Sequence, residues 1–230
     1  MKSSTAILIF SRTATAEARH KTIAGRHTHN ITAHKYLLSK TISNVKDTGI
    51  PYFHFTEKEQ RGATFEDRLQ NSFNRVFQEG YENIICIGSD CPQLTAINLA
   101  EGKIAVESGA ACFGADISGG VYLIAISQKQ FKAGILEGIS WHTSKAFAQL
   151  KQNFDTSGLA YILLSPYKDI NDKKNLLNYL NTREINSSLK WVLLILLGFK
   201  EQFINIGLYR KLFIEVNSVC ILRGPPVCFN

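Results

Sequence analysis

The residue with the clearest chemical potential in this chain is Asp90, which lies in the stretch NIICIGSDCPQL from 83 to 94. Four apolar residues, mostly β-branched, precede Gly88 and predict a buried strand that ends at the carboxyl edge of a sheet. Ligands of open α/β sheets bind outside that edge, and a carboxylate there suits a divalent metal ion that carries phosphates. The alternative is that Asp90 caps the next turn through its side-chain oxygen.

Basic residues form a second candidate group, in the polar segment that follows the first apolar run. Arg12, Arg19 and Lys21 stand there among small residues that permit close approach of the backbone to a ligand. A pyrophosphate group needs cations, backbone N–H donors or both. Residues 13–25 show no clear periodicity, so we expect a loop at the same edge as Asp90. For Arg19 a solvated surface charge is the favoured alternative.

The histidines and cysteines give weaker signals. His27, His29 and His34 have no cysteine or carboxylate at supporting spacing, which argues against a metal site built on them. The five cysteines include no CxxC pair. Cys86 and Cys112 lie in apolar runs, where we expect small buried hydrophobic side chains, and this pattern fits a reducing compartment.

The composition is that of an ordinary globular protein, with 45% hydrophobic and 20% charged residues. The net charge of +7 suits an anionic ligand. No basic run interleaved with aromatic residues occurs, so we expect no nucleic-acid partner. The apolar run at 6–10 is too short for a signal peptide, and the run at 191–197 is too short for a membrane span. We therefore expect a soluble, cytoplasmic protein.

Strand-like and helix-like patterns alternate along most of the chain. The expected strands cover residues 5–10, 51–55, 84–87, 111–114, 121–126 and 161–164. The expected helices cover residues 27–46, 65–80, 96–108, 132–150 with an interruption at 138–141, and 172–180. Such alternation predicts a three-layer α/β/α fold with a mainly parallel sheet. We assign residues 1–186 to this domain.

Residues 187–230 form an apolar C-terminal extension with the runs WVLLILLGF, LFIEV and VCIL. An exposed apolar surface of that size would be an aggregation hazard, so we expect these segments to be buried. They could add strands to the sheet or form the interface of a homo-oligomer.

Five blocks of sequence carry a family resemblance. They are AILIFSR with the downstream Lys21 and Thr22, GATFEDRLQNSF, IICIGSDCPQLT, GADISGGVYLIAI, and the late pair GISWHTSKAF and PYKDINDKKNLL. In this order and spacing they resemble the DUF2064 family, glycosyltransferase-like relatives of the nucleotide-diphospho-sugar transferases. The third block is the most specific, being close to the family's G-[S/T]-D-x-P-x-L.

The resemblance implies a GT-A-like fold that binds a nucleotide or a nucleotide-diphosphate sugar over its first strands, usually with a divalent metal. Position by position, it implies a nucleotide site made of Phe10, Ser11, Arg12, Lys21, Ser89, Gly119 and Gly120. The metal, Mg²⁺ or Mn²⁺, would be held by Asp90 with Asp169 or Asn171.

By the same resemblance, residues 141–143 border the acceptor side of the site. Trp141 could stack on a sugar ring beside Thr143, and His142 could act as a general base, which would make His142 and Asp90 the catalytic residues. The alternative for this segment is that Trp141 anchors the core and His142 is exposed.

Three positions of the implied site are weakened relative to the family pattern. Ser118 stands where the family has the aspartate of Asp-Gly-Gly, Ile23 replaces an arginine, and Asn171 replaces an aspartate. Asp116 would point to the same side as Ser118 and compensate in part.

We therefore expect a glycosyltransferase-like protein that passes a sugar from a nucleotide donor to an acceptor. The alternatives are a nucleotidyltransferase on the same fold, and a catalytically degenerate member with a binding or assembly role. Fold alone does not decide among them.

Overall fold

The computed structural model of this chain describes residues 4–182 together with Lys190 and Leu194. The boundary expected at residue 186 and the arrangement expected for the apolar extension lie outside the described residues, apart from those two positions. Both expectations stay predictions.

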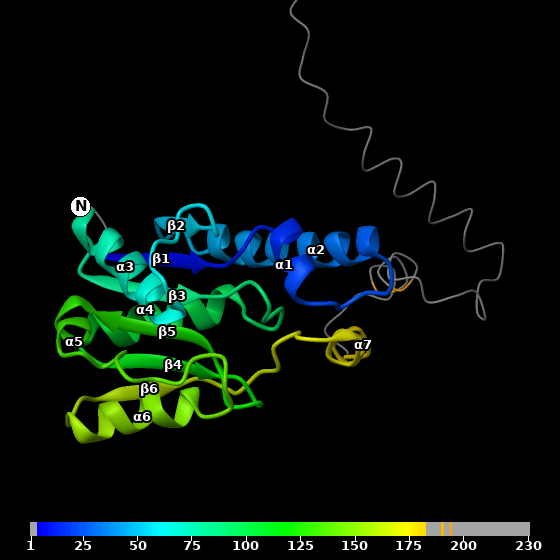
Figure 1. Ribbon diagram of the computed structural model, residues 1–230. Helices are drawn as coiled ribbons and strands as arrows, with labels where there is room; N and C mark the ends of the chain where they lie inside the picture. The colour runs from blue at the N-terminus through cyan, green and yellow to red at the C-terminus, as the bar shows by residue number, and fades with distance from the viewer. Residues whose placement is uncertain (1–3, 183–189, 191–193, 195–230) are drawn as a thin grey trace, which may run out of the picture.

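A six-stranded sheet forms the centre of the molecule (Figure 1). Its strands are β1 (Thr5–Phe10), β2 (Tyr52–Phe55), β3 (Asn83–Ile87), β4 (Ala111–Ala115), β5 (Val121–Ser127) and β6 (Tyr161–Leu163), in the spatial order β2-β1-β3-β5-β4-β6. Only β5 runs against its neighbours in this sheet, pairing antiparallel with β3 and β4. The mainly parallel sheet expected from the sequence is confirmed.

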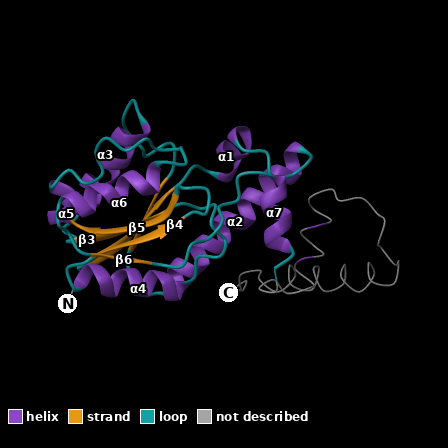
Figure 2. Cartoon of the chain, turned by 90° about the horizontal axis from the view of Figure 1, so that it is seen from below, coloured by secondary structure: helices purple, strands orange, loops and turns teal. Residues whose placement is uncertain are grey.

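Helices cover both faces of the sheet, which gives the three layers that were predicted (Figure 2). They are α1 (Ala14–His20), α2 (His27–Asp47), α3 (Phe65–Gln78), α4 (Ala96–Glu107), α5 (Gln128–Lys132), α6 (Ala146–Thr156) and α7 (Lys173–Leu180). Apolar side chains of α3 and α6 pack on one face of the sheet, and those of α2 and α4 pack on the other. A third apolar cluster joins α2 to α7 at the side of the sheet.

Local capping sets the start of α3 and of α4. Thr64 and Asp67 form a capping box at α3, with both reciprocal hydrogen bonds present. Thr95 and Asn98 do the same at α4. These caps satisfy backbone N–H groups that an isolated helix would leave without partners.

Two expectations about local structure were wrong. The segment 13–25 is not all loop, because Thr13 caps the helix α1 by accepting a hydrogen bond from the N–H of Ala16. The helical pattern at 132–150 is mostly irregular, since α5 ends at Lys132 and α6 begins at Ala146. Between them Gly134 and Gly138 adopt left-handed backbone conformations with φ of +75° and +66°, which interrupt a helix.

The connections of the sheet create a crevice at its carboxyl edge. The chain passes from β1 to β2 through α2 on one face, and from β2 to β3 through α3 on the other. Because β2 and β3 lie on opposite sides of β1, the order of the strands reverses at β1, and ligands of open α/β sheets bind at the carboxyl edge at such a point. Phe10 ends β1, and Asp90 follows β3 at this position.

Candidate functional site

A cavity of about 650 Å³ lies at this carboxyl edge. It is lined by all of the predicted site residues except Gly119, namely Phe10, Ser11, Arg12, Lys21, Ser89, Asp90, Gly120, Trp141, His142, Thr143, Asp169 and Asn171. They come from loops that follow β1, β3 and β4 and from the segments before α6 and α7. The tertiary structure thus brings together residues from five separate segments of the sequence, although their individual roles stay predictions.

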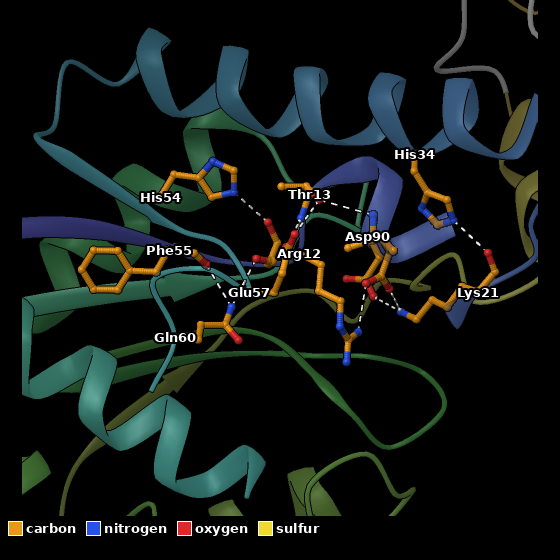
Figure 3. Close-up of polar contacts among 12 residues, drawn as sticks. Arg12, Thr13, Lys21, His34, His54, Phe55, Glu57, Gln60 and Asp90 are labelled. Carbon is orange, nitrogen blue, oxygen red and sulfur yellow. Dashed lines mark hydrogen bonds and ion pairs between the residues drawn. The ribbon is translucent and has the colours of Figure 1, made fainter. Parts of the chain in front are cut away.

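An ion-pair network joins the basic segment to the end of β3 (Figure 3). The Nζ atom of Lys21 lies 2.6 Å from Oδ2 of Asp90 and 3.4 Å from Oε1 of Glu17. Glu17 also pairs with Arg12, at 3.0 Å. Burial lowers the pKa of Lys21, but the charges of Asp90 and Glu17 outweigh this effect and raise the pKa above its ordinary value. Lys21 is therefore charged at neutral pH.

The backbone of Lys21 is held by a residue that sequence reasoning missed. Asn30, on α2, has a buried side chain that makes four hydrogen bonds to the segment 18–24. Its Oδ1 accepts from the N–H groups of Ile23 and Ala24, and its Nδ2 donates to the carbonyls of Ala18 and Lys21. Asparagine offers two donors and two acceptor sites, so one side chain fixes this turn. No local pattern distinguishes it from a surface asparagine.

His34, one turn further along α2, supports the same carbonyl. Its Nε2 lies 3.1 Å from the carbonyl oxygen of Lys21 (Figure 3), and burial lowers the pKa of its imidazole. His34 is thus part of the structure that positions Lys21.

The loop after β1 is fixed by contacts with β2 and the segment after it (Figure 3). The Ser11 hydroxyl lies 3.0 Å from Nε2 of His54, and the Gln60 side chain donates to the Ser11 carbonyl at 3.2 Å. Glu57 accepts hydrogen bonds from the N–H and the hydroxyl of Thr13, at 2.7 and 2.8 Å. These contacts hold the start of α1 at the rim of the cavity.

Three aspartates act on one another at the floor of the cavity. Asp116 is buried, and both of its carboxylate oxygens accept backbone hydrogen bonds, from the N–H of Ser118 and that of Asp169, each at 3.0 Å. Oδ1 of Asp169 is buried without a hydrogen-bond partner among the described residues. Burial, followed by the charges of Asp90 and Asp116, raises the pKa of Asp169 to about 8.

The oxygen donors suit a hard divalent cation. Asp169 offers an oxygen with no partner, Asp90 lies near enough for its charge to raise the pKa of Asp169, and Asn171 adds an amide to the cavity wall. Within the part of the chain that the structure describes, no three His, Cys, Asp or Glu side chains cluster as metal ligands. Mg²⁺ is commonly held by one or two carboxylates with substrate phosphates and water, so the donor set fits a cation that arrives with a phosphate ligand.

Two departures from the family pattern have different structural consequences. Ser118 is exposed at the cavity, and its hydroxyl contacts the ammonium group of Lys168. Ile23 is fully buried in the cluster between α2 and α7, so it does not face the ligand space. The family's arginine at this position is thus replaced by a core residue. Asp116 lies in the cavity wall as expected, but its oxygens are already occupied.

Gly119 has a structural place beside the cavity. Its φ is +92°, and an added Cβ would lie 2.0 Å from the carbonyl oxygen of Ser144. The Gly119 carbonyl accepts a hydrogen bond from the N–H of Phe147, at 3.0 Å. A glycine here lets the loop after β4 touch the start of α6.

Aromatic side chains form part of the cavity wall. The rings of Phe65 and His142 lie 4.2 Å apart in an edge-to-face arrangement, and Trp141 lies 5.7 Å from Phe65. Trp141 packs partly on the core, with a buried Nε1 that has no partner among the described residues, while His142 is exposed. Burial, followed by the charges of Lys21, Arg12 and Arg68, lowers the pKa of His142. Arg68, which also lines the cavity, was not singled out from the sequence.

The family resemblance is confirmed by a match to the family described as "Uncharacterized protein conserved in bacteria (DUF2064)". The match covers residues 50–143, which include β2 to β5 and the segments carrying Asp90 and His142. No protein of curated function matches the chain in sequence.

Solved structures share the fold. A candidate nucleotide-diphospho-sugar transferase from Desulfovibrio desulfuricans G20 superposes with a TM-score of 0.69 at 16% identity, covering 84% of this chain and 94% of that one. Rv0371c from Mycobacterium tuberculosis H37Rv gives a TM-score of 0.50 at 10% identity, covering 79% of this chain and all of that one. The chain therefore has a nucleotide-diphospho-sugar-transferase-like fold. No helix among the described residues is long and apolar enough to cross a membrane.

Proposed function

We propose that this chain, with its DUF2064 segment and transferase-like fold, binds a nucleotide-diphosphate sugar in the carboxyl-edge cavity and transfers the sugar to an acceptor. The observation that carries the proposal is the pairing of Lys21 with Asp90 at 2.6 Å, inside a cavity of about 650 Å³. This volume lies within the ordinary range for small-molecule sites. The cations that a diphosphate needs and the oxygen ligands that a metal ion needs thus lie in the same cavity.

The diphosphate would lie beside Arg12 and Lys21, at the loop after β1 and at the end of α1. Mg²⁺ or Mn²⁺ would be held by Asp90 with Asp169 or Asn171, and when bound it would neutralise charge on the leaving nucleoside diphosphate. Lys21 and Arg12 add fixed positive charge near the same oxygens.

The acceptor would lie toward the aromatic wall. Trp141 offers a ring face for a sugar and an indole N–H without a partner among the described residues. Since its lowered pKa keeps the imidazole neutral near pH 7, His142 can accept the proton from an acceptor hydroxyl.

Thermal unfolding of the full chain with a panel of nucleoside diphosphates and nucleotide sugars, each with and without Mn²⁺, tests this proposal. A ligand at 100 times its Kd stabilises the folded state by about 2.7 kcal/mol. We expect one nucleotide to give such a rise, larger with Mn²⁺, and Asp90→Asn to remove the metal-dependent part.

Asp155→Asn is the matched control. Asp155 also pairs with a lysine, Lys151, at 2.7 Å, but lies on α6 and does not line the cavity. It should leave the nucleotide response intact. An absence of stabilisation by every nucleotide and sugar donor would refute the proposal. Release of pyrophosphate from a nucleoside triphosphate and a sugar phosphate would instead identify a nucleotidyltransferase.

A further inference from the structure

The carboxylate proposed to hold a divalent cation already has a cation bound to it. The ammonium of Lys21 lies 2.6 Å from Oδ2 of Asp90, and both side chains are about a quarter exposed, at 27% each. Glu17 also contacts the same ammonium, at 3.4 Å. Lys21 is therefore the shared counter-ion of two carboxylates.

The main chain at Lys21 cannot easily move away. The Asn30 side chain and the His34 ring both contact its carbonyl oxygen, at 2.8 and 3.1 Å, and α1 accepts its N–H at the Glu17 carbonyl. Only the four-carbon stem of the side chain is free to change rotamer. The ammonium can thus leave Asp90 without any rearrangement of the loop.

Removal of Lys21 would leave an excess of negative charge. The carboxylates of Asp90 and Asp116 both act on Asp169, and the charge of Lys21 opposes them. A divalent ion placed against Asp90 would lie within a few ångströms of the ammonium and be repelled by it. The two cations therefore cannot share Asp90 at full strength.

We propose that Lys21 is the resident counter-ion of the cation site and competes with the divalent metal for Asp90. A diphosphate that draws the ammonium to its own oxygens frees Asp90, so metal and nucleotide bind cooperatively and the metal binds weakly alone. This inference rests on the proposed function for the identity of the anionic ligand. The competition itself involves only Lys21, Asp90 and the metal ion.

The test is a titration of the full chain with Mn²⁺ in the absence of nucleotide, followed by the loss of the free-ion electron paramagnetic resonance signal. Lys21→Met should bind Mn²⁺ about tenfold more tightly than the wild type or better, because a contacting unit charge has been removed. Lys21→Arg, which keeps the charge, should resemble the wild type. In the Asp90→Asn background the substitution Lys21→Met should give no gain.

Arg12→Met is the control for general electrostatics. It removes the same charge from the same cavity, but Arg12 pairs with Glu17 at 3.0 Å. A smaller gain than in Lys21→Met supports direct competition at Asp90. An equal gain in both variants, or unchanged or weaker Mn²⁺ binding in Lys21→Met with native circular dichroism, overturns the inference.

A second titration, in EDTA with ADP, GDP, CDP, UDP and dTDP in turn, separates this inference from the proposed function. Lys21→Met should weaken the binding of the preferred diphosphate, so the one substitution shifts the two affinities in opposite directions. If no diphosphate binds the wild type but Mn²⁺ still binds Lys21→Met more tightly, the proposed function fails and the competition stands. If the diphosphate binds Lys21→Met as well as the wild type, the counter-ion role in cooperativity is wrong.

Discussion

The side-chain amide of Asn30 donates a hydrogen bond to the backbone carbonyl of Lys21, at 2.8 Å, from a position that is 2% exposed. This contact links α2, which lies away from the ligand space, to the lysine that pairs with Asp90. The contact fixes the backbone position from which the Lys21 side chain extends, as a preorganised site requires.

Asn30→Ala should therefore weaken ligand binding as well as the fold. Four backbone groups of the segment 18–24 would lose their hydrogen bond to Asn30, although the Lys21 carbonyl would keep its contact with His34. Each buried group left unpaired costs about 1–3 kcal/mol. We expect a loss of at least about 2 kcal/mol in urea unfolding. Thr41→Val on the same helix, which removes only a bond to the Leu37 carbonyl, is the control for general weakening of α2. If Asn30→Ala still weakens nucleotide binding when Lys21 is already Met, the effect does not pass through Lys21.

Gly119→Ala should be far more damaging than Gly109→Ala, although the two glycines have nearly the same φ, +92° and +90°. A left-handed alanine costs about 1–2 kcal/mol in either place. At Gly109 nothing lies within 4 Å of the new Cβ, whereas at Gly119 it would lie 2.0 Å from a backbone carbonyl oxygen. We expect a further loss of about 1–3 kcal/mol there, measured by denaturant unfolding. Equal losses would mean that the loop after β4 does not touch Ser144 as described.

Restoring the family residue should cost much stability at position 23 and almost none at position 118. Ile23→Arg places a guanidinium in a fully buried apolar cluster and should cost roughly 3–5 kcal/mol of unfolding free energy. Ser118→Asp adds a carboxylate at an exposed position next to Lys168 and should change stability by less than about 0.5 kcal/mol. Chemical denaturation of both variants decides this. A stable Ile23→Arg protein would show that residue 23 can turn toward the cavity after all.

The pH dependence of stability should carry the signature of Asp169. Its pKa in the folded state is raised to about 8, so the native protein holds a proton that the unfolded chain releases near pH 4. Unfolding therefore releases that proton between about pH 4 and pH 8, and the contribution of Asp169 to stability falls as the pH rises through this window.

Asp169→Asn removes this contribution while keeping the shape of the side chain. The difference in unfolding free energy between variant and wild type should grow in favour of the variant from pH 5 to pH 8. Comparing the two proteins cancels the histidines, whose titration is common to both. A difference that is constant over this range would mean that Asp169 is ionised throughout, and added Mn²⁺ should move the wild type toward that behaviour.

The sequence by itself determined the order of the elements and the edge at which the site lies. The β-branched run at 84–87 and the capping residues Thr64 and Thr95 are local signals. The strand at 83–87 and the helices that begin at Phe65 and Ala96 were found where they were expected. Asp90 could be placed at the carboxyl edge because adjacent residues predict both the strand before it and the turn after it. The predictions failed at 13–25 and 132–150, where the periodicity of apolar residues is weak. There the Thr13 cap starts a helix, and glycines with left-handed backbone conformations interrupt one.

Only the tertiary structure decided which groups are free to act. No local sequence pattern predicts that the Asn30 side chain hydrogen-bonds to the backbone of Lys21. The identity of residue 23 likewise does not indicate whether its side chain faces a ligand or the core. From the sequence, Asp116 is a candidate for a carboxylate that is free to bind a ligand. In the structure, the backbone N–H groups of Ser118 and Asp169 donate hydrogen bonds to both of its oxygens. Hydrogen bonding and burial depend on chain segments that are distant in sequence. Residue types and spacing therefore determine the candidate site residues, whereas the tertiary structure determines their hydrogen-bond partners.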